Sequence, residues 1–371
     1  MSGTYEGQEV YENRQMRILS AIGIFLVVAG HLGYSVFEIG DLFPYYSFHV
    51  FIFLFVAGYF YKPEEEERIL LFIVRKAYTL LLPYFIWNLI YGGLTVLLHR
   101  MGFSIGEGLS LKTLFLSPFL DGHQFLYHFP AWFVPALFLV EVIQVCLRRI
   151  LTFLRLNHEW FILAGCLIVG MATVWLAKGG HVWGYYKFPG RLLLMMPGFC
   201  LGRIYKEKLE AWDTLSDGWY LFIVMAVQVL VSIFCNGLAY SVVWCSGFAN
   251  GPWIPYVTVV TGLAFWLRVS RILSRWGWAA SRLCVVGRNT YSIMMHHILG
   301  FMVVKSFFYL LYQHTSLCAG FDVEMYFSEI NFLYLPGGSE AGKWIYIFVG
   351  IGLPLLIARG QEKVTGILRR G

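Results

Sequence analysis

The sequence has few charged residues. Asp, Glu, Lys and Arg together make up 13% of the 371 residues, whereas hydrophobic residues make up 58% and aromatic residues 18%. Soluble globular proteins carry roughly 25% charged residues, so this composition excludes an ordinary soluble domain. Several apolar runs are long enough to cross a bilayer. We therefore predict an all-α, polytopic membrane protein with lipid around it.

Paired cysteines and a cleavable leader are lacking too. The seven cysteines are scattered singly, which indicates neither a zinc site nor a thioredoxin-like motif, so we expect no metal. A disulfide among Cys235, Cys245 and Cys318 stays an alternative to free thiols. The net charge of +6 is spread between the apolar runs, which favours membrane topology over nucleic-acid binding. No small-x-small cleavage site follows the first run, so we expect that run to stay in the mature protein.

Ten apolar runs are candidates for membrane-spanning helices. They are residues 18–37, 48–61, 69–98, 132–154, 160–177, 192–205, 219–238, 254–267, 283–312 and 344–358. The second, sixth and eighth are short for a span of about 20 residues. With both termini in the cytoplasm, most Lys and Arg residues fall on the inner side, as the positive-inside rule requires. We predict about ten transmembrane helices, with N- and C-termini cytoplasmic, in a plasma or inner cell membrane.

The chain reads as a single domain over residues 1–371. It contains no internal repeat, low-complexity tract or long linker, and it leaves no room for a separate extracellular hydrolase-like domain. The outer connection after the third run, residues 99–131, contains Asp121 and His128 among aromatic residues. Loops of this length usually have a task or are disordered. Its aromatic and histidine content favours an ordered cap, with sugar binding as one possible task.

The first apolar run contains a histidine, His31. An ionisable side chain inside a membrane span needs polar partners or a water-filled cavity, so it is a functional candidate. Arg17 lies fourteen residues earlier, within about 40° of the same helix face and about 21 Å away along the axis. His49 opens the second run at its outer end. His31 and His49 can then flank a hydroxyl group, although His49 can equally be an interfacial histidine.

Basic residues gather at the predicted inner ends of the first and third runs. Arg17, Arg75 and Lys76 would form an entrance for a phosphate-bearing donor, because guanidinium groups bind phosphate in a bidentate manner. The alternative is that they only anchor the topology. In the ninth run, Asn289 lies at the inner end, and His296 and His297 follow about 11–12 Å further in. Neighbouring residues point about 100° apart on a helix, so at most one of these two histidines should face a cavity.

These motifs, in this order, resemble the acyltransferase 3 family of integral-membrane O-acyltransferases. The resemblance covers nearly the whole chain and rests on IGIFLVVAGH at residues 22–31, FHVFIFLFVAGY at 48–59, Arg75 with Pro83 and Tyr84, AWFVPAL at 131–137, and GRNTYSIMMHH at 287–297. The chain departs from the family at two positions. Ser20 replaces an arginine eleven residues before the histidine, and Tyr78 replaces one three residues after Arg75. Arg17, one turn before Ser20, can stand in for the first.

The resemblance implies transfer of an acyl group, usually acetyl from acetyl-CoA, to a hydroxyl of a cell-surface polysaccharide or another exported glycan. His31 would be the general base or carry the acyl group. The residues expected at the site are catalytic His31, His49 and His297, and donor-binding Arg17, Ser20, Arg75, Lys76, Tyr78 and Asn289. Two other classes stay open: a transporter or exporter of a glycan or glycolipid, and a relative that has lost the chemistry. The sequence does not indicate the oligomeric state.

Overall fold

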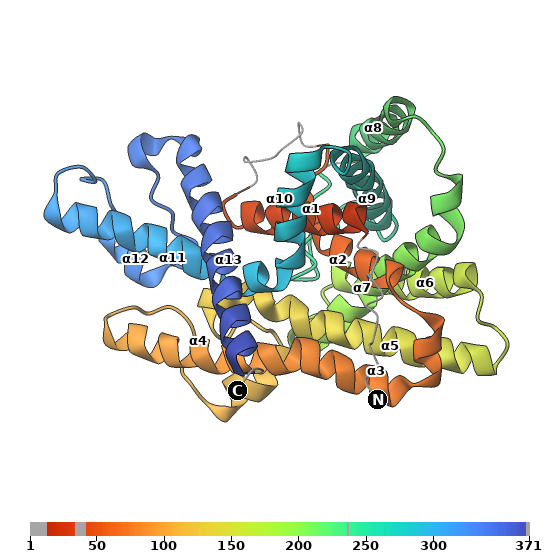
Figure 1. Ribbon diagram of the computed structural model, residues 1–371, viewed down its shortest axis with the longest axis horizontal. Helices are drawn as coiled ribbons and strands as arrows, with labels where there is room; N and C mark the ends of the chain where they lie inside the picture. Colours follow the sequence, from red (N-terminus) through yellow and green to blue (C-terminus); the bar gives the residue numbers. More distant parts are fainter. Residues whose placement is uncertain (1–12, 34–41, 236, 369–371) are drawn as a thin grey trace, which may run out of the picture.

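The computed structural model describes residues 13–33, 42–235 and 237–368 (Figure 1). Within these ranges the chain forms helices and no strand, apart from a single antiparallel bridge between Ser241 and Ser246. The main helices are α1 (Arg14–Gly30), α2 (His49–Tyr59), α3 (Ile69–Lys76), α4 (Leu82–Arg100), α5 (Phe133–Phe153), α6 (Glu159–Lys178), α7 (Lys187–Ile204), α8 (Asp217–Phe234), α9 (Ile254–Leu273), α10 (Gly277–Arg288), α11 (Thr290–His314), α12 (Val323–Ser328) and α13 (Lys343–Leu368). The all-α prediction is confirmed.

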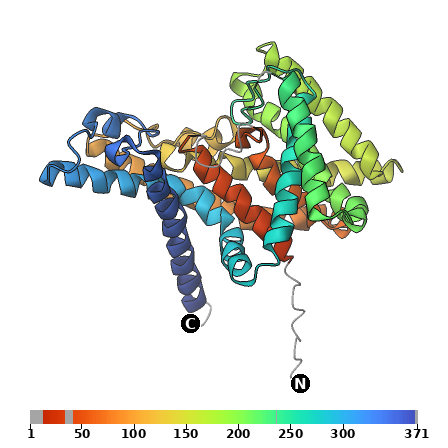
Figure 2. The same cartoon turned by 90° about the horizontal axis from the view of Figure 1, so that it is seen from above.

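Helix α1 lies in the middle of the bundle. It packs against α2, α9, α10 and α11, and Figures 1 and 2 show helices around it on all sides. Its residues from Ile18 to Ile24 are all buried. A helix enclosed by protein can carry polar groups that lipid would exclude, because neighbouring helices supply their partners. The central helix is therefore the place where a buried polar site can be built.

Within the described residues, each of the ten predicted runs overlaps a helix. Residues 34–37 of the first run and residue 236 of the seventh lie outside the described part of the chain. Seven helical segments are long and apolar enough to cross a membrane, among them Ile69–Arg100, Leu126–Phe153 and Thr290–His314. Helices α1, α2 and α7 are not among the seven, because α1 and α2 have only 17 and 11 residues and α7 carries the basic residues Lys187, Arg191 and Arg203. The count of ten crossings and the cytoplasmic termini thus stay predictions. Helix α1 begins and α13 ends on the same side of the molecule (Figure 2).

The ninth predicted span, residues 283–312, is wrong because it joins two separate helices into one. The predicted run continues across the polar residues Arg288, Asn289 and Thr290, but the structure divides it at Asn289 into α10 and α11. Asn289 has φ −104° and ψ 19°, outside the helical range. Its side-chain amide donates to the carbonyl of Val285 at 2.8 Å, so it caps the end of α10. This turn brings α10 back beside the start of α1.

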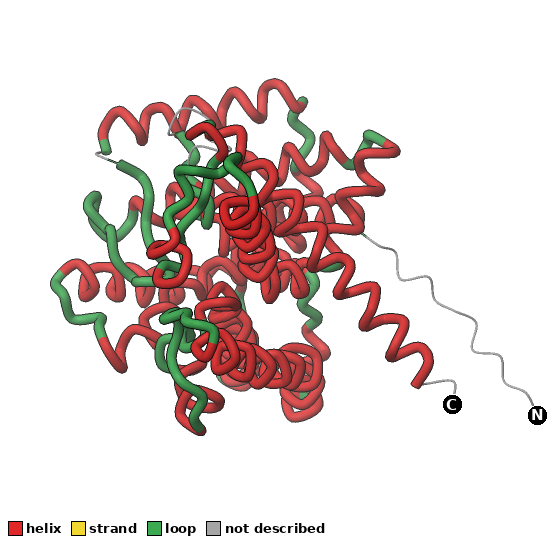
Figure 3. The backbone as a smooth tube through the Cα atoms, turned by 90° about the vertical axis from the view of Figure 1, so that its left-hand side faces the viewer, coloured by secondary structure: helices red, strands yellow, loops and turns green. Residues whose placement is uncertain are grey.

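Long loops gather on one side of the bundle. Figure 3 shows most of them opposite the end of α13. They include the connection between α4 and α5, which contains the short helix η7 (Leu126–Trp132), and the connection between α11 and α13. Helix α1 ends on this side at Gly30, followed by His31. The histidine predicted from the first run therefore lies beneath the loops, as a cap over the bundle would require.

Helices α2 and α7 touch through glycines. A Cβ atom on Gly58 would come within 1.9 Å of the carbonyl oxygen of Phe199, and one on Gly202 would come equally close to that of Phe55. Real Cβ atoms do not approach backbone oxygen so closely, so the two helices could not meet here with larger residues. Close approach between small residues is a common way to join helices in membranes. This contact holds α2, with its cavity-lining residues, against the bundle.

We expect Gly202→Ala to destabilise the protein by about 1–3 kcal/mol, because the added methyl group overpacks the contact with α2. The matched control is Gly165→Ala on α6, where no atom lies within 4 Å of the added Cβ. That change should leave the unfolding temperature unchanged or raise it slightly. Thermal unfolding of the detergent-solubilised protein measures both. Equal unfolding temperatures for the two variants would contradict the close contact.

Candidate functional site

One face of α1 joins two cavities. Ser20, Ile24, Val27 and His31 follow the i, i+4, i+7, i+11 pattern and so share one face of the helix. Ser20 lines a cavity at one end of α1, and His31 lines another at the opposite end. Eleven residues separate them, or about 16 Å along the axis. The site is therefore elongated, with α1 as its spine.

The first cavity is rich in charge. It has a volume of about 450 Å³, and its charged lining residues are Arg17, Glu65, Arg75, Lys76, Glu141 and Arg288. Four cations face two carboxylates, which leaves a net positive potential. Ser20, Thr79 and Thr290 add hydroxyl groups to the wall. Such a cavity can bind an anion with several oxygen atoms, because guanidinium, ammonium and hydroxyl groups all donate hydrogen bonds.

The predicted basic residues at this cavity are held by carboxylates. Lys76 Nζ lies 2.8 Å from Oε1 of Glu141, a side chain that is almost fully buried on α5. Arg75 is half exposed and pairs with Glu65. Buried Glu141 needs a cationic partner, so Lys76 is held in place. An exposed pair contributes little free energy, so an arriving anion can draw Arg75 away from Glu65.

A close contact between α1 and α10 fixes Arg17. A Cβ atom on Gly287 would lie 2.0 Å from the carbonyl oxygen of Arg17. The absence of a side chain thus allows the end of α10 to lie directly against the first turn of α1. Arg288 and Thr290, on either side of the Asn289 break, line the same cavity as Arg17. The break that the sequence did not predict therefore completes this cavity.

Tyr78 and Asn289 do not line the first cavity, although both were expected at the donor site. The chain forms a π-helical turn at Ala77–Leu81, whose wider turn changes which residues face inwards. Tyr78 is consequently 67% exposed on the outside of the bundle, and Thr79 lines the cavity instead. Asn289 uses its amide to cap α10. Ser20 does line the cavity, with its hydroxyl donating to the carbonyl of Met16 at 2.9 Å.

The second cavity lies under the loops at the other end of α1. Its volume is about 650 Å³, and its polar lining residues are His31, Tyr46, His123, Ser241, Trp244 and Asn331. The His31 ring meets Phe129 edge-on at 4.9 Å between centroids. None of these lining side chains carries a permanent charge. The wall thus suits a neutral, hydroxyl-bearing molecule.

Two histidine rings lie together at this cavity. The rings of His31 and His297 are 5.2 Å apart between centroids. His297 Nδ1 lies 2.8 Å from the carbonyl oxygen of Ile293. A carbonyl can only accept, so Nδ1 carries the hydrogen and Nε2 of the neutral ring is the basic nitrogen. That Nε2 is buried and makes no hydrogen bond to the described residues. The neighbouring His296 points elsewhere, with Nδ1 2.8 Å from the hydroxyl of Tyr91.

His49 is close to the second cavity without lining it. Its Nδ1 donates to the carbonyl of Tyr45 at 2.6 Å. Its ring meets Tyr46 edge-on at 5.2 Å, and Tyr46 donates to the carbonyl of Gly30 at 2.6 Å. Tyr46 therefore stands between His49 and the cavity. The histidine ring in direct contact with His31 is that of His297. The pairing of His31 and His49 around a hydroxyl group stays a prediction.

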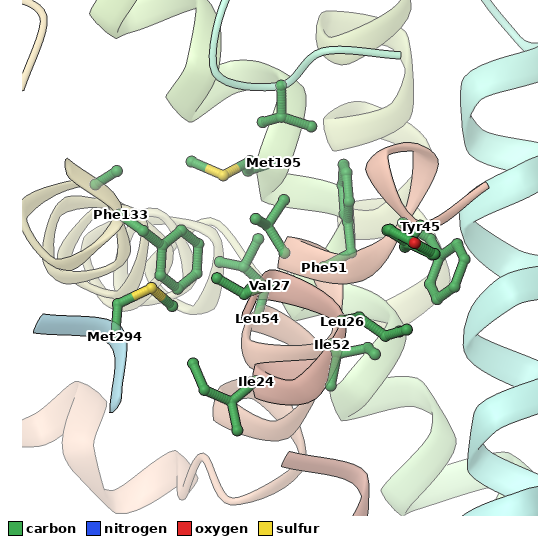
Figure 4. Packing of buried hydrophobic residues seen from close by; sticks show 14 of the residues in the cluster. Ile24, Leu26, Val27, Tyr45, Phe51, Ile52, Leu54, Phe133, Met195 and Met294 are labelled. Carbon is green, nitrogen blue, oxygen red and sulfur yellow. The ribbon is translucent and has the colours of Figure 1, made fainter. Parts of the chain in front are cut away.

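An apolar layer separates the two cavities. Two helical segments each place a residue of the first cavity, an apolar residue and a residue of the second in series: Ser20, Val27 and His31 along α1, and Leu137, Phe133 and Phe129 along α5 and η7. On α11, Thr290 of the first cavity is followed by Met294 and by His297, whose ring contacts His31. Val27, Phe133 and Met294 are at most 5% exposed. Figure 4 shows Ile24 and Val27 facing Phe133 and Met294. Placing a charged group in this layer would cost much more free energy than placing an apolar one.

Several residues of the two cavities were missed by sequence reasoning. Glu141 carried a signal, because a carboxylate inside an apolar run needs a partner. Thr79 and Thr290 carried none, because hydroxyl residues are common in membrane helices. Trp244 lies in a connection between α8 and α9 that contains no recognisable motif. Only the fold brings it beside His31.

No curated protein and no solved structure matches the chain significantly. One family model, described as an acyltransferase domain, matches residues 13–358. This match covers nearly the whole chain, from the first residue that the structure describes to the second half of α13. The chain therefore belongs to the acyltransferase 3 family, a family of membrane acyltransferases.

Proposed function

We propose that the protein is an O-acyltransferase that moves an acyl group, acetyl in the first instance, from cytoplasmic acyl-CoA to a hydroxyl of an exported or cell-surface glycan. The observation that carries this proposal is the pair of cavities on one face of α1. One is cationic and contains Arg17 and Ser20, and the other is neutral and contains His31. A phosphate-bearing donor and a hydroxyl acceptor require these two different environments.

The donor would bind with its phosphates in the first cavity. Arg17, Arg75, Lys76 and Arg288, which all line this cavity, supply the charge. The acyl end, which is uncharged, would extend past Ile24 and Val27 towards His31. The apolar layer suits this because it admits an uncharged chain and holds back the phosphates. The phosphate end of one donor molecule would thus lie in the cationic cavity, and its acyl end would reach the neutral cavity.

Transfer can then follow either of two routes. In the first, a His31 ring nitrogen takes the proton of the acceptor hydroxyl while that oxygen attacks the thioester carbonyl. The C–S bond breaks, and the thiolate leaves with the proton as CoA thiol. In the second, the His31 nitrogen attacks the thioester carbonyl, the C–S bond breaks, and CoA leaves as the thiol with a proton from the ring. The acceptor hydroxyl then attacks the acyl-imidazole, the C–N bond breaks, and the hydroxyl proton returns to the ring. His297, at 5.2 Å between ring centroids, can orient His31 or bind the hydroxyl in both routes.

The test is acyl transfer by the purified protein. We would reconstitute it in proteoliposomes with labelled acetyl-CoA on the side of the chain termini and glycan on the other side. We expect release of CoA and an added acetyl mass on the glycan. Movement of glycan without loss of acetyl-CoA would show a transporter instead. Neither transfer nor movement would indicate a relative without activity.

Gly287→Ala should raise the KM for acyl-CoA about tenfold and change kcat less. The added Cβ forces α10 away from the carbonyl of Arg17, so Arg17 and Arg288 no longer face the same donor phosphates. Loss of one charge-assisted hydrogen bond costs about 1.5–3 kcal/mol, which is at least tenfold in affinity. The control is Gly277→Ala on the same helix, where no atom lies within 4 Å. Equal KM values in steady-state assays of both variants would contradict this role.

A further inference from the structure

A third hollow adjoins the second cavity. It has a volume of about 300 Å³ and is lined by Leu120, Asp121, Trp183, Gly184, Tyr185 and Lys187. Small-molecule sites in proteins have volumes of about 300–1,000 Å³, so the hollow is large enough for one compact ligand. It lies on the loop side of the bundle, at the start of α7. The function proposed above gives it no role.

A single layer of side chains separates this hollow from the cavity of His31. Lys187, which lines the hollow, has its ammonium 3.9 Å above the ring of Trp244, which lines the cavity. Asp121 of the hollow lies 3.2 Å from Nδ1 of His123, another residue of the cavity. The rings of His123 and Trp244 are stacked, 5.3 Å apart. A ligand that occupies both the hollow and the second cavity therefore has to cross only this layer of side chains.

A buried arginine holds the wall in place. Arg191 on α7 is fully buried, and it donates to the carbonyls of Asp121 at 2.8 Å and Val243 at 2.6 Å. Its guanidinium also stacks 4.7 Å above Trp132. It thus ties the loop of Asp121 to the loop of Trp244. The ammonium of Lys187 pairs with the Asp121 carboxylate. The polar groups of the hollow are consequently fixed before any ligand arrives, which lowers the entropy cost of binding.

The chemistry of the hollow fits a neutral sugar. Burial alone would raise the pKa of Asp121, but the neighbouring His123 and Lys187 outweigh it and hold that pKa well below its usual value. Burial lowers the pKa of His123, so its ring is neutral at pH 7. The hollow thus offers an ionised acceptor, an ammonium donor and the exposed aromatic rings of Trp183 and Tyr185. Sugars have hydroxyls at the ring edge and apolar C–H faces, which match these groups.

We propose that this hollow is a second sugar-binding subsite, so that the acceptor spans at least two sugar units. One unit would present its hydroxyl to His31 in the second cavity, and the next would lie between Trp183 and Tyr185 beside Asp121. This inference rests on the proposed function and adds that the preferred acceptor has a minimum length of two sugar units. An exported oligosaccharide or polysaccharide fills both subsites, whereas a free monosaccharide fills only the second cavity and is the poorer acceptor.

The test compares acceptors of different length. Partial hydrolysis of the purified surface polysaccharide of the source cell supplies mono-, di- and longer oligosaccharide fragments. We would measure acetyl transfer to each fragment by the wild type, Trp183→Ala, Tyr185→Ala and the control Tyr186→Ala. Tyr186 is 71% exposed and follows Tyr185 directly, but it does not line the hollow.

We expect the two hollow variants to raise the KM for disaccharide and longer fragments about tenfold. Their KM for monosaccharide and for acetyl-CoA should be unchanged, and Tyr186→Ala should behave as the wild type. Equal effects of all three substitutions would overturn the subsite and indicate an aromatic belt at the membrane surface. So would a wild type that accepts mono- and oligosaccharides equally well.

A binding measurement separates this proposal from the proposed function. Thermophoresis of the labelled protein with the oligosaccharide fragments, without donor, requires no catalysis. Weaker binding by Trp183→Ala, with unchanged binding by Tyr186→Ala, supports the subsite even if no acyl transfer occurs. Equal binding by the wild type and both of these variants overturns it even if transfer does occur.

Discussion

His31→Ala is expected to abolish acyl transfer while the protein still folds and inserts into the membrane. The imidazole is the basic group that α1 brings to the second cavity, at the opposite end from the cationic one. Removal of a general base lowers rates by about 10²–10⁴-fold, and removal of an acyl carrier lowers them further. His31→Gln should be equally inactive, because an amide keeps the approximate volume but accepts no proton. Release of CoA and acylation of glycan measure the loss.

The control for His31 is His314→Ala, an exposed histidine at the end of α11. It should keep full activity. His297→Ala should retain some transfer, about a tenth, because His297 acts through its contact with the His31 ring. Wild-type protein incubated with acetyl-CoA and no acceptor distinguishes the two routes, since an acyl-protein adduct forms only if His31 carries the group. Full activity of His31→Ala would remove this residue from the mechanism.

The positions of the helices could be predicted because apolar runs report burial in lipid or protein directly. The prediction failed where a local conformation interrupts an apolar run. Cys284, Val285 and Val286 continue the pattern to within three residues of Asn289, and no proline or glycine pair marks the break there. The side chain of Asn289 makes the break by hydrogen bonding its own helix. Such competition between side chain and backbone depends on the surroundings, so periodicity cannot reveal it.

The histidines and cations of the site could be recognised individually, but not their pairing. Arg75 and Tyr78 share one face of a regular helix, and the π turn at Ala77–Leu81 removes Tyr78 from that face. His297 was expected to be the inward member of its pair, and its ring does lie beside His31. His123 and Trp244 come from two loops far apart in the chain. Their two loops are joined by buried Arg191, which binds the Asp121 carboxylate and two backbone carbonyls, and carbonyl partners leave no pattern in the sequence.

Val27→Phe is expected to block transfer without preventing the donor from binding. Val27 lies between Ser20 and His31 on the face of α1 that joins the two cavities, and it is 4% exposed. The larger ring would fill the apolar layer formed with Phe133 and Met294 (Figure 4). If the acyl end must pass this layer, transfer should drop at least a hundredfold, because even small displacements of reacting groups are costly. The affinity for acyl-CoA should change less than threefold, since the phosphates bind in the first cavity.

Three further variants test whether the loss of transfer in Val27→Phe comes from filling the apolar layer. Val27→Ala widens it and should keep transfer to the glycan while admitting longer acyl chains. Phe25→Trp adds bulk on another face of α1, about 140° away from Ser20, and should have little effect. Met294→Phe narrows the layer from α11 and should reproduce the block, although overpacking can cost about 1–3 kcal/mol of stability. Unfolding temperatures identify any variant that is merely destabilised. Normal transfer by folded Val27→Phe and Met294→Phe would mean that the acyl group reaches His31 by another path.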